Sequence, residues 1–193
     1  PKLNTANPEV KDYLLKVATY WIEEFDIDAW RLDVANEIDH QFWRDFRKAV
    51  LAKKPDLYIL GEIWHSSQPW LNGDEFHAVM NYPLSESIKD YFLRGHKETQ
   101  RFIWEINSQS MYYRQQISEV MFNLLDSHDT ERILTTAKGD LQSVKSALAF
   151  LYLQRGTPCI YYGTELALIG GPDPECRRVM PWERVPADND LLT

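Results

Sequence analysis

Cysteine, glycine and long apolar runs are all scarce in this chain of 193 residues. The 2 cysteines, Cys159 and Cys176, do not make a disulfide framework, and we expect both to be reduced thiols. The longest wholly apolar stretch, residues 147–153, is far shorter than the ~18 residues that a membrane span needs. No glycine-rich phosphate loop follows an apolar segment, which weakens a nucleotide-binding interpretation.

Positive charge is also in short supply. Lys and Arg number 21 against 29 Asp and Glu, which gives a formal net charge of −8, and no basic block occurs. Phosphate-backbone binding depends on clustered cations, so we expect neither nucleic acid nor an anionic membrane surface as a partner. A neutral ligand suits the chain better. The 7 Trp and 10 Tyr supply aromatic faces of the kind on which CH-rich molecules, sugars included, can pack.

Helical and strand-like apolar patterns alternate along the chain. Asn7 is a suitable N-cap, Pro8 fits the first helical position, and apolar residues recur at helical spacing up to Phe25. Further helices are predicted at residues 40–52 and 140–154, and irregularly joined helices at residues 83–120. Short apolar runs predict strands at residues 27–34, 57–60, 76–82, 121–125 and 159–162. The tail from Gly163 has loop-like composition.

This alternation predicts an α/β fold with a parallel sheet and helices outside it. Two architectures fit, an open doubly wound sheet and a (β/α)8 barrel. A complete barrel takes ~250 residues and eight strands, whereas about five strands are expected here. If the fold is a barrel, the chain contains a partial (β/α)8 barrel only.

Acidic residues follow three of the predicted strands. Asp33 and Glu62 are 29 residues apart, close to one βα unit of ~30, and Asp129 comes 67 residues after Glu62. Residues at equivalent points of successive units face one end of a barrel, where barrel enzymes place their catalytic groups. We therefore expect the three carboxylates to converge. Buried like charges repel one another, so such a cluster favours a function over separate ion pairs.

That cluster leaves two chemistries open, metal-assisted hydrolysis and glycoside hydrolysis by a carboxylate pair. Metal sites usually include histidine, and the chain has only 5. His128 is next to Asp129, and His65 follows Glu62. We do not favour a metal, and we assign no metal and no cofactor.

Four stretches resemble the alpha-amylase superfamily of glycoside hydrolases in order and spacing. They are residues 29–37 (AWRLDVANE), 61–64 (GEIW), 124–129 (LLDSHD) and 156–165 (GTPCIYYGTE). Within that superfamily, three further features are similar to the neopullulanase, cyclomaltodextrinase and maltogenic amylase group. These are residues 34–37, the opening residues 1–4 (PKLN) and the tail at 170–177 (GGPDPECR).

By this resemblance Asp33 is the nucleophile, Glu62 the general acid/base and Asp129 the transition-state stabiliser. A retaining glycosidase needs two carboxyl groups roughly 5–5.5 Å apart, one ionised and one protonated. Arg31 precedes Asp33 by two residues on the same strand face, so we expect it to keep Asp33 ionised. For Glu62 we expect a less polar pocket, which would keep it protonated.

The resemblance also implies residues that contact the sugar. His128 would donate hydrogen bonds to sugar hydroxyls. Asn36 and Glu37 would lie on the aglycone side, where many starch enzymes of the superfamily carry Lys and His instead. That difference would tune the acceptor. Trp64 either stacks on a glucose or packs in the core.

Two residues of the tail, Asp173 and Arg177, are implied contacts of the glucose on the non-reducing side. Asp126 and Tyr82 are expected to be structural, the first at a strand end and the second in the core. The resemblance makes residues 1–193 the C-terminal part of the catalytic barrel, roughly its fourth to eighth strands. The N-terminal domain, the first barrel strands and the C-terminal β-domain would then be absent.

The implied function is a retaining glycoside hydrolase with an oligosaccharide or α-glucan substrate. Cyclodextrins, pullulan or starch would be cleaved at α-1,4 bonds, with α-1,6 bonds and transglycosylation as further options. We expect a cytoplasmic protein and a homodimeric parent enzyme. The chain alone is expected to be inactive and to self-associate through open barrel edges. The alternatives are a non-catalytic sugar-binding or assembly module of the same fold, and an unrelated α/β protein with accidental strand-end acids.

Overall fold

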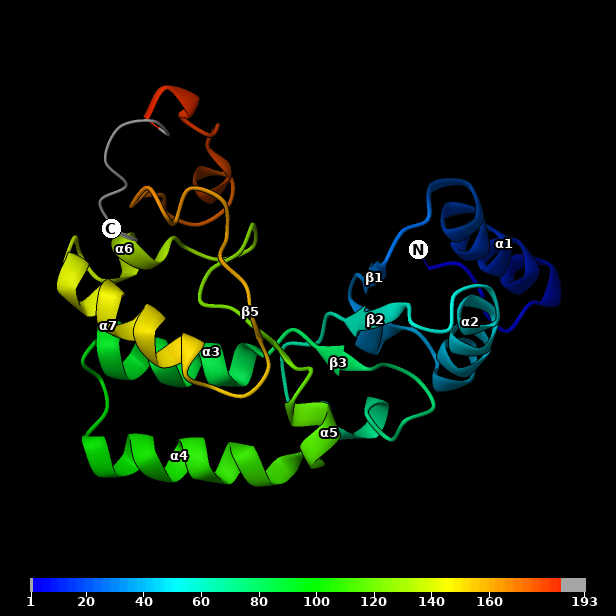
Figure 1. The fold of residues 1–193 in the computed structure, drawn as a ribbon, viewed down its shortest axis with the longest axis horizontal. Helices are drawn as coiled ribbons and strands as arrows, with labels where there is room; N and C mark the ends of the chain where they lie inside the picture. Colours follow the sequence, from blue (N-terminus) through cyan, green and yellow to red (C-terminus); the bar gives the residue numbers. More distant parts are fainter. Residues whose placement is uncertain (1, 185–193) are drawn as a thin grey trace. The chain divides into compact units, whose positions relative to one another are not determined.

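The computed structural model describes residues 2–184, and the chain divides into two compact units (Figure 1). The first unit contains residues 2–80 and 113–121, and the second contains residues 81–112 and 122–184. Pro1, which belongs to the opening motif, lies outside the described residues. None of the helices within residues 2–184 has the length and apolar character that crossing a membrane requires.

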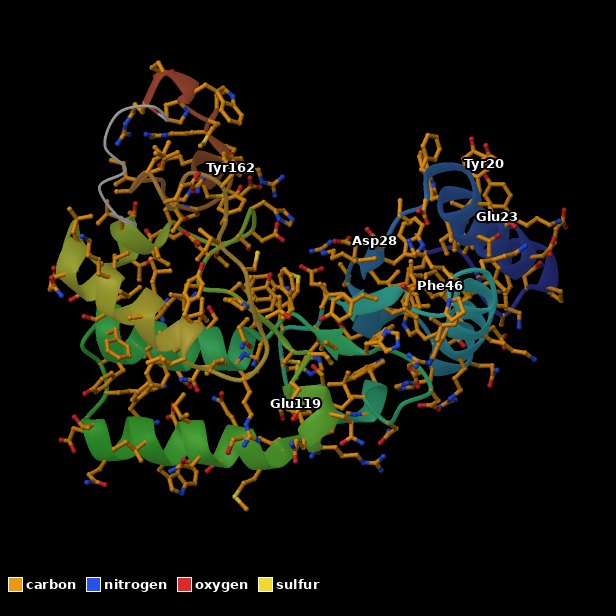
Figure 2. All side chains as sticks on the ribbon, viewed as in Figure 1. Tyr20, Glu23, Asp28, Phe46, Glu119 and Tyr162 are labelled. Carbon is orange, nitrogen blue, oxygen red and sulfur yellow. The ribbon has the colours of Figure 1, made fainter. Side chains whose placement is uncertain are left out.

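Two helices of the first unit begin and end close to their predicted positions. Helix α1 (Pro8–Phe25) starts where the Asn7 side chain accepts hydrogen bonds from two backbone amides, and it ends at Asp26 in the left-handed conformation. Helix α2 (His40–Lys53) is capped by Asp39. The two helices pack together, and Figure 2 labels Phe46 on α2. The centroids of the Phe46 and Trp30 rings are 6.4 Å apart.

Three parallel strands in the order β1-β2-β3 form the sheet of this unit, as the alternating pattern predicts. Strand β1 (Ala29–Leu32) pairs with β2 (Tyr58–Gly61) in a register that sets Leu32 opposite Gly61. Strand β3 (Ala78–Val79) pairs with the end of β2. Short helical turns η1 (Ala35–Glu37) and η2 (Gln68–Trp70) and helix α5 (Gln115–Ser118) complete the unit.

The second unit contains a helical core and a pair of parallel strands, β4 (Phe122–Asn123) and β5 (Thr157–Pro158). Its helices are α3 (Tyr82–Ile88), the π-helical turn η3 (Lys89–Leu93), α4 (Thr99–Tyr112), α6 (Ile133–Thr136) and α7 (Leu141–Tyr152). Single helical turns follow at η4 (Glu175–Arg177) and η5 (Trp182–Arg184). The irregular joins predicted for residues 83–120 are confirmed by the π-helical turn.

Two predicted strands are wrong in extent or position. Residues 76–82 were expected to form one strand, but the strand is Ala78–Val79, and α3 already begins at Tyr82 with Pro83 in its first turn. Tyr82 is buried, as expected. The last strand is Thr157–Pro158 and not residues 159–162. Tyr161 and Tyr162 lie beyond the strand, and the Arg132 guanidinium lies over their rings, 4.1 and 4.6 Å from the ring centroids.

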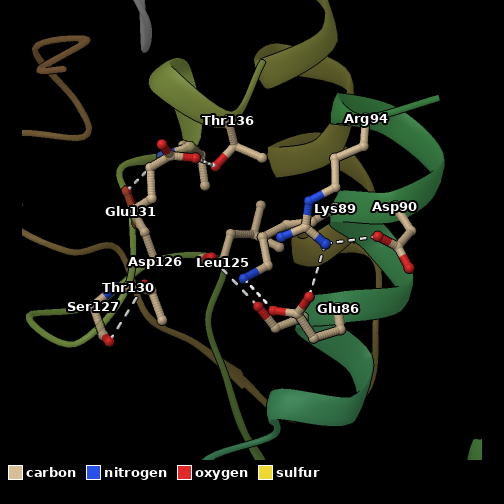
Figure 3. Close-up of polar contacts among 12 residues, drawn as sticks. Glu86, Lys89, Asp90, Arg94, Leu125, Asp126, Ser127, Thr130, Glu131 and Thr136 are labelled. Atoms are coloured by element: carbon tan, nitrogen blue, oxygen red, sulfur yellow. Dashed lines mark hydrogen bonds and ion pairs between the residues drawn. The ribbon is translucent and has the colours of Figure 1, made fainter. Parts of the chain in front are cut away.

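An ion-pair network surrounds the π-helical turn (Figure 3). Lys89 is almost fully buried and pairs with Glu86 at 2.5 Å, while Arg94 pairs with Glu86 at 2.8 Å and with Asp90 at 2.6 Å. Burial alone would raise the pKa of Glu86, but hydrogen bonds from Lys89 and Arg94 outweigh it and lower that pKa. The network thus compensates the burial of a lysine inside the core helices.

We predict that His77 makes the chain sensitive to acid. Its Nδ1 accepts a hydrogen bond from the Ile59 amide at 3.0 Å, and burial, assisted by the charge of Arg47, lowers its pKa to about 4. The unfolded chain binds this proton near pH 6.5, so the stability contributed by neutral His77 is present above that pH and is lost as the pH falls towards 4.

The check is urea unfolding of the wild type and His77→Asn at pH 7 and pH 5. Between these pH values the wild type should lose about 1–2 kcal/mol more unfolding free energy than the variant. All other titratable groups are the same in the two proteins, so their contributions to the pH dependence of the unfolding free energy cancel in the comparison. Equal losses in the two proteins would contradict the prediction.

Candidate active site

Asp33 and Glu62 follow neighbouring strands at the same edge of the sheet. Leu32 and Gly61 are the last paired residues of β1 and β2, so Asp33 and Glu62 come directly after the same pair. The Glu62 amide donates to the Leu32 carbonyl at 2.9 Å, and the Ala35 amide donates to the Glu62 carbonyl at 3.0 Å. The backbone after β1 is therefore fixed against the backbone after β2.

Glu62 is buried, with 4% of its side chain exposed, yet both of its oxygens have a polar partner. Arg31 Nη2 lies 2.7 Å from Oε1, and the Val34 amide donates to Oε2 at 2.9 Å. The sequence predicts a less polar pocket, and the structure differs from that expectation. The Glu62 side chain is shielded from water, but its nearest partners are a cation and a peptide N–H.

Arg31 joins the two carboxylates. Its second terminal nitrogen, Nη1, donates to Asp33 Oδ1, so one guanidinium contacts both acids. Asp33 is 73% exposed, in contrast with Glu62. The predicted pairing of Arg31 with Asp33 is therefore present, and the structure brings Arg31, Asp33 and Glu62 together at one strand edge.

The other candidates of the first unit closely follow Asp33 and Glu62 in the sequence. Asn36 and Glu37 lie on η1, directly after the Asp33 turn. Lys2 pairs with the Glu37 carboxylate, and this hydrogen bond and charge lower the pKa of Glu37. Trp64 lies two residues after Glu62 and is 48% exposed, so it is not packed in the core; sugar stacking stays a prediction.

The four site candidates of the second unit also lie together. His128 Nε2 is 3.0 Å from Asp129 Oδ2, and Arg177 Nη2 donates to Asp129 Oδ1 at 3.1 Å. Arg177 Nε is 2.8 Å from both the His128 carbonyl and Asp173 Oδ1. The tail turn η4 therefore supplies the cation that holds Asp129.

Asp126 orders the loop that leads to Asp129. This buried carboxylate accepts hydrogen bonds from Thr164 Oγ1 at 2.8 Å and from the Ile133 amide at 3.2 Å. Burial raises its pKa. Ser127 and Thr130 close the loop itself, since the Ser127 amide donates to Thr130 Oγ1 at 2.8 Å (Figure 3). These contacts agree with the predicted structural role of Asp126.

Sequence reasoning missed two residues that hold the candidate site. Arg132 is buried and donates to the Cys176 carbonyl at 3.0 Å, which ties α6 to the tail. An arginine beside apolar residues was the available signal for it. Val34 acts through its backbone. It belongs to the 34–37 motif, but a β-branched residue gives no sign of the left-handed conformation that it adopts.

The predicted convergence of all three carboxylates stays a prediction, because Asp33 and Glu62 belong to the first unit and Asp129 to the second. Among residues 2–184, no group of three or more His, Cys, Asp or Glu side chains is arranged to hold a metal ion.

We predict a strong energetic coupling between Arg31 and Glu62. Arg31→Met leaves a buried carboxylate without its cation, so it should lower the unfolding free energy by about 2–4 kcal/mol. Adding Glu62→Gln to that variant removes the buried charge and should restore much of the loss. A double-mutant cycle by urea unfolding measures the coupling.

A matched control is Lys11→Met, which breaks the more exposed Lys11–Asp45 pair of 2.6 Å. Its cost should stay below about 1 kcal/mol. If Arg31→Met costs no more than Lys11→Met, the buried pair does not contribute as argued.

Comparison with known proteins assigns this chain to a family. The family described as "Alpha amylase, catalytic domain" matches residues 1–191. The chain is 57% identical to the intracellular maltogenic amylase of Bacillus subtilis (strain 168) over 192 residues, which is 100% of this chain and 33% of the relative. It is 50% identical to neopullulanase 2 of Thermoactinomyces vulgaris, again over 100% of this chain and 33% of the relative.

A solved structure of a cyclomaltodextrinase superposes with a TM-score of 0.96 at 55% identity, over 99% of this chain and 33% of that one. The chain thus spans about a third of the length of these relatives. The three names agree with the group that the motifs resemble. This chain belongs to the alpha-amylase family, within its catalytic domain.

Proposed function

We propose that this chain carries the catalytic carboxylates of a retaining α-glucan glycoside hydrolase of the maltogenic amylase, cyclomaltodextrinase and neopullulanase group. The observation that carries the proposal is the pair of strand-end acids, Asp33 and Glu62, held by one guanidinium. Such a pair is the minimal machinery of double-displacement glycoside hydrolysis.

In the proposed first step the exposed Asp33 carboxylate bonds to the anomeric carbon. Glu62 gives its proton to the glycosidic oxygen, so the bond between that oxygen and the anomeric carbon breaks as the glycosyl ester forms. In the second step Glu62 takes a proton from water, whose oxygen displaces Asp33. A sugar hydroxyl in place of water gives transglycosylation. Asp129, held by His128 and Arg177, is proposed to stabilise the charge that develops on the sugar.

The substrate class is proposed from the relatives and from the exposed groups at the site. The relatives are named for maltogenic, cyclomaltodextrin and pullulan activities, so α-1,4 bonds are the first expectation and α-1,6 bonds the second. The half-exposed Trp64 offers a ring face for a glucose unit, and Asn36 and Glu37 follow on η1. Asp173 and Arg177 are proposed contacts on the non-reducing side.

We also propose that residues 1–193 correspond to the fourth to eighth strands of the family's (β/α)8 barrel. The order of the parallel strands and the match to a third of each relative support this assignment. The parent enzyme is proposed to be a cytoplasmic homodimer. The word "intracellular" in the name of the Bacillus subtilis relative supports the location. The chain alone is expected to be inactive and to self-associate.

The test replaces the matching third of the Bacillus subtilis relative with residues 1–193. The chimera should release new reducing ends from a cyclomaltodextrin, and Glu62→Gln should lower kcat by roughly 10²–10⁴-fold because the proton donor is lost. Glu23→Gln is the matched control. It makes the same chemical change at an exposed residue of α1 paired with Lys53, and it should leave kcat unchanged.

Circular dichroism confirms that each chimera is folded before the assay. A folded chimera without turnover, or one whose turnover survives Glu62→Gln, would contradict the proposed function. Binding of the cyclomaltodextrin without turnover would instead favour a non-catalytic module.

A further inference from the structure

Val34 adopts a backbone conformation that its side chain disfavours. Its φ of 43° and ψ of 47° place it in the left-handed region, although valine is β-branched. Its side chain is about half exposed, so it is not held by burial in the core. Unfavourable backbone conformations persist only where surrounding contacts maintain them, and they concentrate at functional sites.

The surrounding contacts all fix the turn between β1 and η1. The Val34 amide donates to Glu62 Oε2 at 2.9 Å, and the next amide, that of Ala35, donates to the Glu62 carbonyl at 3.0 Å. On the other side, the indole N–H of Trp43 donates to the Ala35 carbonyl at 2.8 Å. The left-handed residue thus turns two successive N–H groups towards one glutamate.

We propose that Val34 is a positioning residue for Glu62, whose peptide N–H holds Oε2 and so assigns the transferable proton to Oε1. This inference rests on the proposed function, in which Glu62 is the proton donor.

The two oxygens of Glu62 have different partners, a hydrogen-bond donor at Oε2 and a cation at Oε1. Oε2 faces the Val34 N–H, which the turn holds in place, and Oε1 faces Arg31 Nη2 at 2.7 Å. A hydrogen added to Oε2 would oppose the amide hydrogen already there, whereas Arg31 Nη2 lies against Oε1 as a charge and makes no hydrogen bond to it. The backbone amide cannot move away without unfolding the turn, whereas the Arg31 side chain can rotate and keeps Asp33 as its second partner.

The proton balance follows from this difference. Oε1 takes a proton from solvent as Arg31 Nη2 withdraws, and Arg31 stays bound to Asp33. Oε1 then gives that proton to the glycosidic oxygen while Asp33 bonds to the anomeric carbon. Water returns a proton to Oε1 in the second step. Throughout, Oε2 remains the acceptor of the Val34 N–H.

The experiment replaces the Val34 peptide N–H by an ester oxygen, through incorporation of the α-hydroxy analogue of valine into the full chain. The side chain is kept and only the donor is lost. The readout is the 13Cδ resonance of Glu62 followed against pH, assigned with Glu62→Gln. Because the lost hydrogen bond stabilises the carboxylate, the titration midpoint of Glu62 should rise by about one pH unit, a tenfold change in its acid dissociation constant.

A matched control makes the same backbone change at Tyr58, whose N–H donates to the Asp28 carbonyl at 2.9 Å at the other end of β1 and β2. It removes a hydrogen bond of equal length that does not reach Glu62. Its Glu62 midpoint should stay within about 0.2 units of the wild type while stability falls. An unchanged midpoint with the ester at position 34, or an equal shift with the ester at position 58, would overturn the proposal.

A second measurement uses the unmodified chain and does not depend on the ester variant folding. If Oε1 takes the proton, the Val34 amide keeps its hydrogen-exchange protection through the titration of Glu62, while the Arg31 guanidinium resonances change. Loss of protection at Val34 on protonation would overturn the assignment. Neither measurement requires turnover, so failure of this inference is distinguishable from failure of the proposed function, which the chimera tests.

Discussion

The ion pair between Arg31 and Glu62 is the interaction on which the candidate site of the first unit depends. A carboxylate buried as deeply as Glu62 is costly unless a cation and hydrogen-bond donors compensate it. The register of β1 on β2 sets Arg31 opposite Leu60, two residues before Glu62, and the same guanidinium reaches Asp33. One side chain therefore accounts for the burial of one acid and the orientation of the other.

Asp126, the buried acid of the second unit, has different partners from Glu62. The direct hydrogen-bond partners of Asp126 are a hydroxyl and an amide, both neutral, and burial raises its pKa. It joins the end of β4 to α6 and to Thr164. Asp129, the candidate reactive acid, is only partly buried and is held by His128 and Arg177. Burial therefore does not separate these two acids by their predicted roles, and what differs is the direct partners of each carboxylate.

Local signals explain which parts of the structure could be predicted from the sequence. Asn7 and Pro8 act within one helical turn and apolar residues recur at helical spacing, so α1 and α2 were predicted to within a residue or two. The strands near residues 82 and 162 were misplaced: apolar runs continue past β3 into α3 and past β5, and the contact of Tyr161 with Arg132 joins residues distant in sequence. The acids of the site were found because they follow apolar strands. Their partners were found only in part, because side-chain and backbone geometry decides which donor reaches which oxygen.

Val34 shows why a residue with an unfavourable conformation can suit its position. Glycine would adopt a positive φ at lower cost, but it also populates many other conformations. The left-handed region open to a side-chain-bearing residue is small, so a valine held there has few neighbouring conformations to explore. The contacts of Ala35 with Glu62 and Trp43 maintain that conformation. The direction of the Val34 N–H towards Glu62 is then fixed more narrowly than a glycine turn would fix it.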